Sequence, residues 1–376
     1  MVLDIPFNRL WLRDHCRCAE CFHPITRQRL VDTFRVTNHW PQEVKRTDAG
    51  IEITWKEGNS DGTQHISAYP WDWLSHADNR SKVSESVEFG LTAAGKEYWT
   101  SSISRSPPTV SYEDVMVSET AVLTWLEKVY RHGFCFVSDV PPTPEDTEQL
   151  IKRIAFIRET HYGGFWDFTA DLAHGDTAYT NLALKAHTDT TYYTDPCGLQ
   201  IFHLLSHTEG SGGESLLVDG FRAASELKTL YPDDWEILST TPVPTHSVGD
   251  VSYKYVLRKG HPIISSSDGE PSLIRYNNDD RSIMKTSRSD EISSWYRALV
   301  RWDSVLRSSE SEYWFKLTPG TVIVIDNHRV LHGRAAFTGK RRMCGAYIGR
   351  DDYMARLLAL QDQRAPPGQS VWDPML

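Results

Sequence analysis

Two histidines and one aspartate stand at spacings that a protein can use to hold ferrous iron. His187 and Asp189 are separated by one residue at the edge of a β-rich stretch, and alternation along a strand directs both side chains to the same side. His332 follows much later, shortly after the apolar run 321–325. Two imidazoles and one carboxylate on one face of iron leave three positions open for other ligands. The pair alone also fits a surface histidine beside a turn aspartate, and His332 is what strengthens the prediction.

A cation suited to a small dicarboxylate follows the second histidine. A five-carbon dicarboxylate that chelates iron through one end needs a positive charge for its other carboxylate, and arginine supplies it through two hydrogen bonds. Arg341 is a candidate, within the run Lys340-Arg341-Arg342. A solvated surface charge is the alternative interpretation of the same residue.

Three cysteines near the N-terminus indicate a second metal site. Cys16, Cys18 and Cys21 lie too close together for ordinary core residues. Three thiolates and one imidazole form a closed tetrahedral site of the structural zinc type, and such a site would stabilise a small domain. Spacing alone leaves the histidine open among five candidates: His15, His23, His39, His65 and His76.

Aromatic residues surround the proposed iron ligands in the sequence. Tyr162, Trp166 and Tyr179 precede the His-x-Asp pair, and Tyr347 follows Arg341. Aromatic faces attract quaternary ammonium groups, which cannot donate hydrogen bonds. Because 11% of the chain is aromatic, each of these residues taken singly is equally well explained as part of a core.

Composition limits the partners and the compartment. The 376 residues carry a formal net charge of -10 and no Lys/Arg-rich run, which argues against nucleic acid and anionic membranes as partners. No stretch approaches the roughly 20 apolar residues of a membrane span. The first residues resemble neither a signal peptide nor a transit peptide. We therefore expect a cytoplasmic location, or the mitochondrial matrix if a leader is missing from this chain.

The elements that must position these residues are mainly strands. We predict a small β-rich zinc-binding domain at 1–90, a Gly/Ser/Pro-rich linker at 91–111 and a larger domain at 112–376. Many short strands with flanking helices favour a jelly roll. The clearest predicted strands are 51–55, 199–205, 215–218 and 321–325. The clearest predicted helices are 119–131, the segment that Thr143 and Pro144 begin, and 290–307.

Taken together, these motifs resemble a known family. His187-Thr-Asp189, Gly212-Gly-Glu-Ser215, the block from Asp326 to Arg334, and Arg341 are similar to the γ-butyrobetaine/trimethyllysine branch of the Fe(II)/2-oxoglutarate dioxygenases. The similarity extends from Trp11 to about Leu358. It implies a double-stranded β-helix, iron on the three ligands above, and 2-oxoglutarate on Arg341 helped by Ser215. It also selects His65, before Asp72-Trp-Leu74, as the zinc histidine, and it implies ascorbate as reductant and a homodimer.

The resemblance also implies a substrate site. The family's ammonium cage matches Tyr162, Trp166, Tyr179 and Tyr347, and Asn277 matches an amide near the substrate carboxylate. At Asp176 the butyrobetaine enzymes have an amide; a carboxylate there would pair with an α-ammonium and repel a lone carboxylate, although it could equally be a helix cap or turn.

The implied activity is hydroxylation of N6,N6,N6-trimethyllysine at C3 with dioxygen, which yields 3-hydroxytrimethyllysine in the first step of carnitine biosynthesis. The alternatives are γ-butyrobetaine hydroxylation, oxidation of a sulfonate or another small acid, and a non-catalytic β-barrel that binds metal or methylated ammonium groups.

Overall fold

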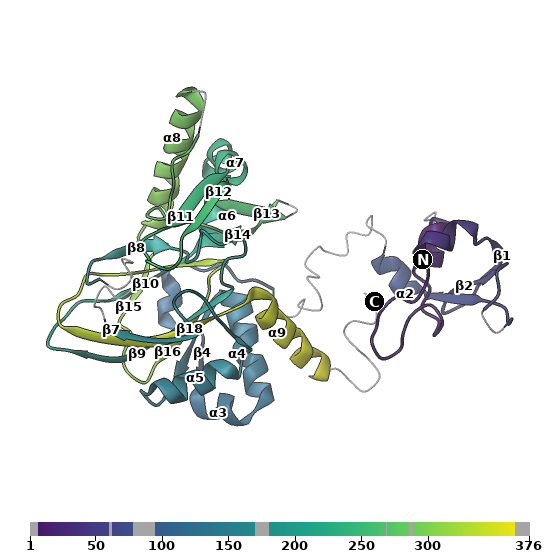
Figure 1. The fold of residues 1–376 in the computed structure, drawn as a ribbon, viewed down its shortest axis with the longest axis horizontal. Coiled ribbons are helices and arrows are strands. Elements are labelled where there is room, and N and C mark those ends of the chain that lie inside the picture. The colour runs from purple at the N-terminus through teal and green to yellow at the C-terminus, as the bar shows by residue number, and fades with distance from the viewer. Residues whose placement is uncertain are drawn as a thin grey trace. The chain divides into compact units, whose positions relative to one another are not determined.

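The computed structural model describes residues 7–59, 62–77, 95–169, 180–267, 269–285 and 289–364. The chain forms two compact units, residues 1–93 with 362–376 and residues 94–361 (Figure 1). Each unit has its own hydrophobic core. Within the described ranges, no helix is both long enough and apolar enough to cross a bilayer.

The smaller unit is built on an antiparallel sheet of three strands in the order β1-β2-β3. The predicted strand at 51–55 is confirmed as β2, and its residues Ile53 and Trp55 point into a core completed by Tyr69 and Leu74. Its elements are α1 (Arg9–Asp14), η1 (Thr33–Asn38), β1 (Pro41–Arg46), β2 (Gly50–Trp55), β3 (Ile66–Pro70) and α2 (Trp71–His76).

The larger unit contains two sheets. The major sheet has the order β4-β5-β16-β9-β18-β6, with β7 also paired to β18, and the minor sheet has the order β15-β10-β17-β8. The strands of the major sheet are β4 (Thr109–Ser111), β5 (Phe134–Ser138), β6 (Ile157–Arg158), β7 (Phe165–Thr169), β9 (Leu199–Thr208), β16 (Val322–Asp326) and β18 (Lys340–Ile348). Those of the minor sheet are β8 (Leu184–His187), β10 (Ser215–Asp219), β15 (Tyr313–Phe315) and β17 (Val330–Arg334).

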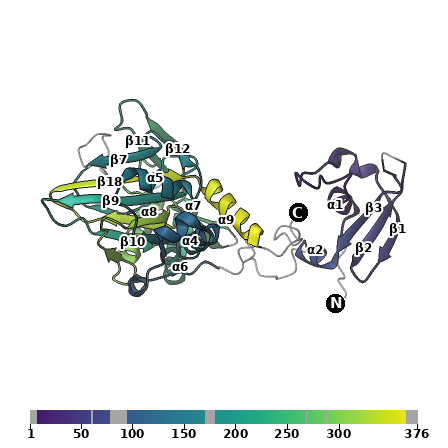
Figure 2. The ribbon, with the colours of Figure 1, turned by 90° about the horizontal axis from the view of Figure 1, so that it is seen from below.

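The two sheets pack face to face around one core. Phe134 and Ile325 from the major sheet and Leu217 and Val330 from the minor sheet belong to the same buried cluster. The β-branched run of β16 is buried along its whole length, as expected for a central strand. The jelly-roll expectation is therefore confirmed: this is the double-stranded β-helix, with helices on its outside (Figure 2).

Helices cover the sheets where the sequence predicts them. α4 begins after the cap Ser118 and ends at Gly133, which adopts a left-handed conformation (φ 76°) that favours glycine. α5 has the predicted Thr143 cap and Pro144 at its first position. α6 and α8 pack on the minor sheet in a second buried cluster. The helices of this unit are η3 (Ser101–Arg105), α3 (Tyr112–Val117), α4 (Glu119–His132), α5 (Pro144–Lys152), α6 (Gly220–Leu230), α7 (Pro232–Thr240) and α8 (Ser289–Leu306), followed by α9 (Arg350–Arg364). Two hairpins complete it: β11 (Val243–Ser247) with β12 (Tyr255–His261), and β13 (Ile264–Ser267) with β14 (Glu270–Ile274).

The expected linker at 91–111 needs correction over its described part. Residues 95–111 belong to the larger unit: Trp99 is buried, η3 follows it, and β4 pairs in parallel with β5. The Ser/Pro content of this segment suggested a linker, but Ser, Thr and Pro also form ordered turns and helix caps. Here Thr100 caps η3.

A buried ion pair ties this segment to the barrel. Arg329 donates to Asp219 through Nε (3.1 Å) and Nη2 (2.7 Å), and both side chains are almost fully buried. Arg329 also donates to the carbonyls of Arg131 and Glu97, while Asp219 accepts from the Trp99 amide. A bidentate pair with its remaining donors satisfied holds four chain segments together.

Replacing Asp219 with alanine should destabilise the larger unit by about 3–5 kcal/mol, because it leaves the Arg329 guanidinium buried without its carboxylate. Urea unfolding followed by circular dichroism measures this change. The matched control is Glu148→Ala, which removes an exposed pair with Lys152 and should change stability by less than about 1 kcal/mol. Equal effects of the two substitutions would contradict the role of the buried pair.

Candidate iron and substrate site

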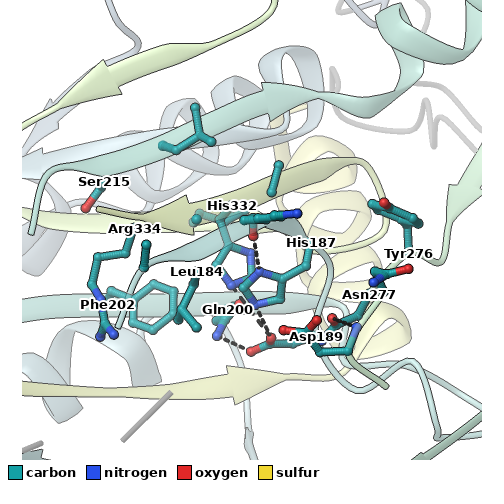
Figure 3. A pocket seen from close by; sticks show the side chains of 18 of the residues that line it. Leu184, His187, Asp189, Gln200, Phe202, Ser215, Tyr276, Asn277, His332 and Arg334 are labelled. Carbon is teal, nitrogen blue, oxygen red and sulfur yellow. Dashed lines mark hydrogen bonds and ion pairs between the residues drawn. The ribbon is translucent and has the colours of Figure 1, made fainter. Parts of the chain in front are cut away.

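The three predicted iron ligands converge at the edge of the minor sheet. His187 ends β8 and His332 lies directly opposite it on β17, so their imidazoles lie side by side with ring centroids 4.4 Å apart. Asp189 follows β8, and its Oδ1 lies 3.1 Å from His187 Nε2 and 3.7 Å from His332 Nε2. Figure 3 shows the three side chains pointing toward one another. One ligand atom from each lies within 4.8 Å of the others.

These separations fit a metal ion. Ligand atoms bound at right angles about 2.1 Å from a metal lie about 3.0 Å apart, which is close to the His187–Asp189 distance. His187 Nδ1 donates to the Lys185 carbonyl at 2.8 Å, and this bond leaves the Nε2 lone pair for a metal. His332 Nδ1 is buried and has no hydrogen-bond partner within the described ranges.

The charges of the triad also suit a cation. Burial raises the pKa of Asp189, but the hydrogen bond from His187 and the two imidazoles lower it below its usual range. Burial lowers the pKa of His332 to about 3, so this imidazole is neutral. Burial lowers the pKa of His187 as well, but the hydrogen bond and charge of Asp189 outweigh it and raise the value to about 9. A metal bound here therefore displaces a proton from His187.

The buried guanidinium of Arg341 suits the distal carboxylate of a dicarboxylate. Its side chain is 7% exposed, whereas Arg342, its neighbour on β18, is exposed and pairs with Asp167. Within the described ranges, Arg341 has no hydrogen-bond acceptor or ion-pair partner, only the Phe337 ring at 5.7 Å. Burial and the nearby Arg334 lower the pKa of Arg341 to about 10, so it keeps its charge at neutral pH. Ser215 and Arg341 line the same cavity.

One cavity of about 530 Å³ joins these parts. Figure 3 shows Ser215 and Arg334 on one side of the triad and Tyr276 and Asn277 on the other. The predicted site residues that line the cavity are His187, Asp189, His332, Arg341, Ser215, Tyr162, Trp166, Asn277 and Tyr347. Asp176 and Tyr179, also predicted, fall in 170–179 and lie outside the described residues.

Tyr162, Trp166 and Tyr347, the described residues of the predicted cage, line this one cavity. The Trp166 ring lies 6.4 Å from that of Tyr347 in an edge-on arrangement, and the Tyr162 hydroxyl lies 3.0 Å from that of Tyr192. Asn277 Oδ1 accepts from the Asp279 amide at 3.0 Å, so the NH₂ group is the part of this side chain that can donate.

Sequence reasoning missed Gln200 and Asn327, which hold these groups, and it missed the contact of the predicted Tyr347 with Asp189. Gln200 and Tyr347 both donate to Asp189 Oδ2. Asn327 accepts from the Asp189 amide at 2.7 Å and donates to its carbonyl at 3.0 Å. Asn327 belongs to the motif from Asp326 to Arg334, and this position was a sequence signal that could have identified it. Gln200 lies within β9 and belongs to no motif that would mark it as a site residue.

Gly345 is a further residue that the sequence did not single out. A side chain there would meet the Ile201 carbonyl oxygen at 1.9 Å and the Trp166 ring at 2.4 Å. Only glycine lets the Trp166 ring lie against β18 at this point.

The three clustered cysteines lie in the smaller unit, and His65 is next to all three of them. Cys16, Cys18 and Cys21 place their Sγ atoms 3.4, 3.6 and 3.6 Å from His65 Nε2. Tetrahedral zinc, with bonds of about 2.3 Å to sulfur and 2.0–2.1 Å to nitrogen, would separate sulfur and nitrogen by about 3.6 Å. Within the described ranges His65 is the histidine that joins the three thiols, as the family resemblance implied.

Two donors support the thiols from outside the cluster. Ser67 donates to Cys16 Sγ at 2.9 Å and Arg13 donates to Cys21 Sγ at 3.1 Å. The pKa of Cys16 is lowered to about 3, chiefly by a hydrogen bond from Cys21. The cluster therefore favours a thiolate at Cys16.

A jelly roll that carries an iron triad with open positions, next to a buried cation for a dicarboxylate, defines the 2-oxoglutarate-dependent non-haem iron oxygenases. A model described as "Taurine catabolism dioxygenase TauD, TfdA family" matches residues 95–347, and one described as "Gamma-butyrobetaine hydroxylase-like, N-terminal" matches residues 4–75. The chain belongs to the TauD, TfdA dioxygenase family, in the branch that contains the trimethyllysine dioxygenases.

Two relatives that are at least 40% identical show this placement, and a third is more distant. Trimethyllysine dioxygenase of Neurospora crassa is 42% identical over 383 residues, covering 92% of this chain and 79% of that protein. The mitochondrial trimethyllysine dioxygenase of Homo sapiens is 40% identical over 362 residues, covering 94% and 83%. Gamma-butyrobetaine dioxygenase of Homo sapiens is 29% identical over 364 residues, covering 95% and 92%.

Proposed function

We propose that this dioxygenase hydroxylates N6,N6,N6-trimethyllysine at C3, the first step of carnitine biosynthesis. The observation that carries the proposal is a single cavity in which cage aromatics, the metal triad and Arg341 meet. The relatives named trimethyllysine dioxygenase are 40–42% identical to this chain over most of its length, which supports this substrate over others.

The chain's own residues would orient two organic molecules around one metal. Arg341 would bind the distal carboxylate of 2-oxoglutarate, and Ser215, which lines the same cavity, would assist it. His187, Asp189 and His332 hold iron, which when bound couples oxidation of the keto acid by dioxygen to hydroxylation of the substrate. The overall change is balanced: 2-oxoglutarate, dioxygen and the substrate C–H give succinate, carbon dioxide and the substrate C–OH.

The aromatic cage would determine which substrate carbon is hydroxylated. Trp166, Tyr162 and Tyr347 hold the trimethylammonium group through cation–π attraction, and Asn277 donates to the carboxylate at the other end. With both ends fixed, one part of the substrate chain would be held beside His187, Asp189 and His332, and this positioning would favour reaction at C3 over the other carbons.

Turnover with two substrates tests the proposal. The purified protein is incubated with ferrous iron and 2-oxoglutarate plus either trimethyllysine or γ-butyrobetaine, and succinate and hydroxylated product are measured. We expect product from trimethyllysine at a kcat/KM at least about tenfold higher. Preference for γ-butyrobetaine would overturn the substrate assignment, and no succinate with either would favour a non-catalytic binding protein.

Replacing Trp166 with alanine tests the cage directly. The substitution removes one cation–π partner, worth about 0.5–2 kcal/mol, together with its buried contact area. We expect KM for trimethyllysine to rise about 10- to 100-fold while KM for 2-oxoglutarate changes less than about threefold. Steady-state kinetics with each substrate varied in turn measures both, and equal increases would remove Trp166 from the cage.

We also propose that the thiol cluster binds one structural zinc ion. All four ligand positions would be filled by Cys16, Cys18, Cys21 and His65, so zinc would hold the small sheet together without binding substrate. We expect Cys18→Ser to lower zinc content to a small fraction of one ion per chain and to unfold the smaller unit, as seen by metal analysis and limited proteolysis. Cys135→Ser, at a buried cysteine of the larger unit, is the matched control and should keep the zinc.

We also propose a reductant, an oligomeric state and a cellular location for this protein. Ascorbate would keep the iron ferrous, and its omission should slow repeated turnover. The protein would form a homodimer, which light scattering can measure. We propose a cytoplasmic location, with the mitochondrial matrix as the alternative; the names of several vertebrate relatives include the word "mitochondrial". Cell fractionation distinguishes the two.

A further inference from the structure

Tyr347 belongs to both the cage and the iron site. Its ring lines the cavity and lies edge-on to Trp166. Its hydroxyl donates to Asp189 Oδ2 at 2.7 Å. One side chain therefore joins the surface that would receive a trimethylammonium group to a carboxylate that would bind iron.

The neighbouring strand reinforces this link. Gln200 is the cross-strand partner of Tyr347 in the β9–β18 ladder, and it is 2% exposed. Its Nε2 donates to the same Oδ2 of Asp189 and lies 3.4 Å from the Tyr347 hydroxyl. The two donors form a closed triangle with the carboxylate, so neither can turn away without leaving a buried polar group unpaired.

The two oxygens of Asp189 consequently have different partners. Oδ1 faces His187 and His332, whereas Oδ2 is held by Tyr347 and Gln200. A carboxylate restrained in this way presents only Oδ1 to a metal, and the positions needed by a keto acid and dioxygen stay free.

The backbone beside the ligand is held as firmly. Thr190 has φ 54°, a left-handed conformation that is strained for a β-branched residue. Thr190 Oγ1 accepts from the Cys197 amide at 2.9 Å, and Asn327 bonds both the amide and the carbonyl of Asp189. Because the main chain cannot relax, a change in the Tyr347 hydrogen bond acts on the carboxylate itself.

We propose that Tyr347 is a positioning residue that couples occupancy of the ammonium cage to metal binding by Asp189. A cation against the tyrosine ring draws electron density from it and makes the phenol a stronger donor. The strengthened hydrogen bond fixes Oδ2 more firmly and leaves Oδ1 ordered for the metal. The inference rests on the proposed function only in needing a trimethylammonium ligand in the cage, which trimethyllysine and γ-butyrobetaine both supply.

Coupling between two ligands is reciprocal, so it can be measured from the metal side. Manganese(II) serves as a redox-stable probe of the iron site in the full chain, and free manganese is counted by its electron paramagnetic resonance signal. Titrations are run without ligand, with trimethyllysine and with γ-butyrobetaine, all without 2-oxoglutarate. For the wild-type protein we expect at least one of the two ligands to tighten manganese binding about fivefold or more.

Tyr347→Phe keeps the ring and removes only the hydroxyl. We expect manganese binding without ligand to weaken about 10- to 100-fold, and the tightening by ligand to fall below about twofold. Tyr112→Phe is the matched control, because it also removes a tyrosine hydroxyl that donates to a carboxylate, here that of Asp146, but Tyr112 does not line the cavity. It should keep both the wild-type manganese affinity and the ligand effect once the ligand is saturating.

A further titration separates the effect of the ligand's positive charge from the effect of its packing in the cage. An analogue of trimethyllysine with carbon in place of the ammonium nitrogen fills the cage without a cation, and it should tighten manganese binding much less than the charged ligand. Zinc content and thermal unfolding check that each variant is folded.

The proposal is overturned if Tyr347→Phe keeps the wild-type ligand effect, if Tyr112→Phe loses it equally, or if neither ligand affects manganese binding to the wild-type protein. An effect with γ-butyrobetaine alone supports the coupling while it contradicts trimethyllysine as the substrate, so the two proposals can fail separately.

Discussion

His187→Ala is expected to lower succinate formation at least about 1,000-fold and to reduce bound iron below a tenth of the wild-type content. The two remaining ligands, Asp189 and His332, would hold a divalent ion through one carboxylate oxygen and one imidazole, and such a site loses most of its affinity. Substitution also removes the hydrogen bond that lowers the pKa of Asp189, so protons compete more strongly for the remaining carboxylate.

Metal analysis and turnover together test this result. Zinc content should stay at the wild-type level, because the thiol cluster lies in the other unit. The matched control is His207→Ala: His207 lies on β9 and bonds the Thr338 carbonyl, so its loss should leave iron content unchanged. Loss of both metals in the His187 variant would indicate unfolding, and retained iron with wild-type turnover would remove His187 from the site.

Arg341→Met should raise KM for 2-oxoglutarate on the order of 100-fold or more. Methionine keeps much of the apolar volume but leaves the distal carboxylate without its charged, bidentate partner, a loss of about 2–5 kcal/mol in a desolvated site. Steady-state kinetics with 2-oxoglutarate varied measures the change. KM for the quaternary ammonium substrate should move far less, since the cage is built from other residues.

The neighbouring arginine supplies a close control. Arg342 lies next to Arg341 on β18 and exposes its guanidinium, which pairs with Asp167. Arg342→Met should change KM for 2-oxoglutarate less than about twofold. If both substitutions raise it equally, the effect comes from the overall charge of the strand and the assignment of Arg341 is wrong.

Local patterns predicted the elements of this fold well. The apolar face of α4, the cap of α5 and the buried run of β16 act over a few residues, so each leaves its own trace in the sequence. Strand alternation also explains Arg341: within Lys340-Arg341-Arg342 only the middle residue is buried. The linker prediction failed over residues 95–111 because what holds them, the Arg329–Asp219 pair, joins residues 110 positions apart.

The site was predictable where chemistry restricts residue type. Few side chains hold iron or bind a dicarboxylate, so His187, His332 and Arg341 were recognisable from type and order. Gln200 acts through a hydrogen bond that many polar residues could make, and only the register between β9 and β18 reveals it. Asn327 stands in a recognisable motif, but the fold of the Asp189 loop is what shows its contacts. Tyr347 was predicted as a cage aromatic, but its hydroxyl bond to Asp189 was not.

The two ligand sets differ in chemical softness, and this difference has a consequence for handling the protein. Thiolates of the Cys16 cluster favour zinc over ferrous iron, but imidazole and carboxylate also bind zinc more tightly than iron by the usual order of divalent ions. Zinc supplied in excess would therefore occupy His187, Asp189 and His332 as well and act as an inhibitor. Preparations should receive one equivalent of zinc first and ferrous iron afterwards, and a low activity measured in zinc-rich buffer would say more about metal exchange than about the enzyme.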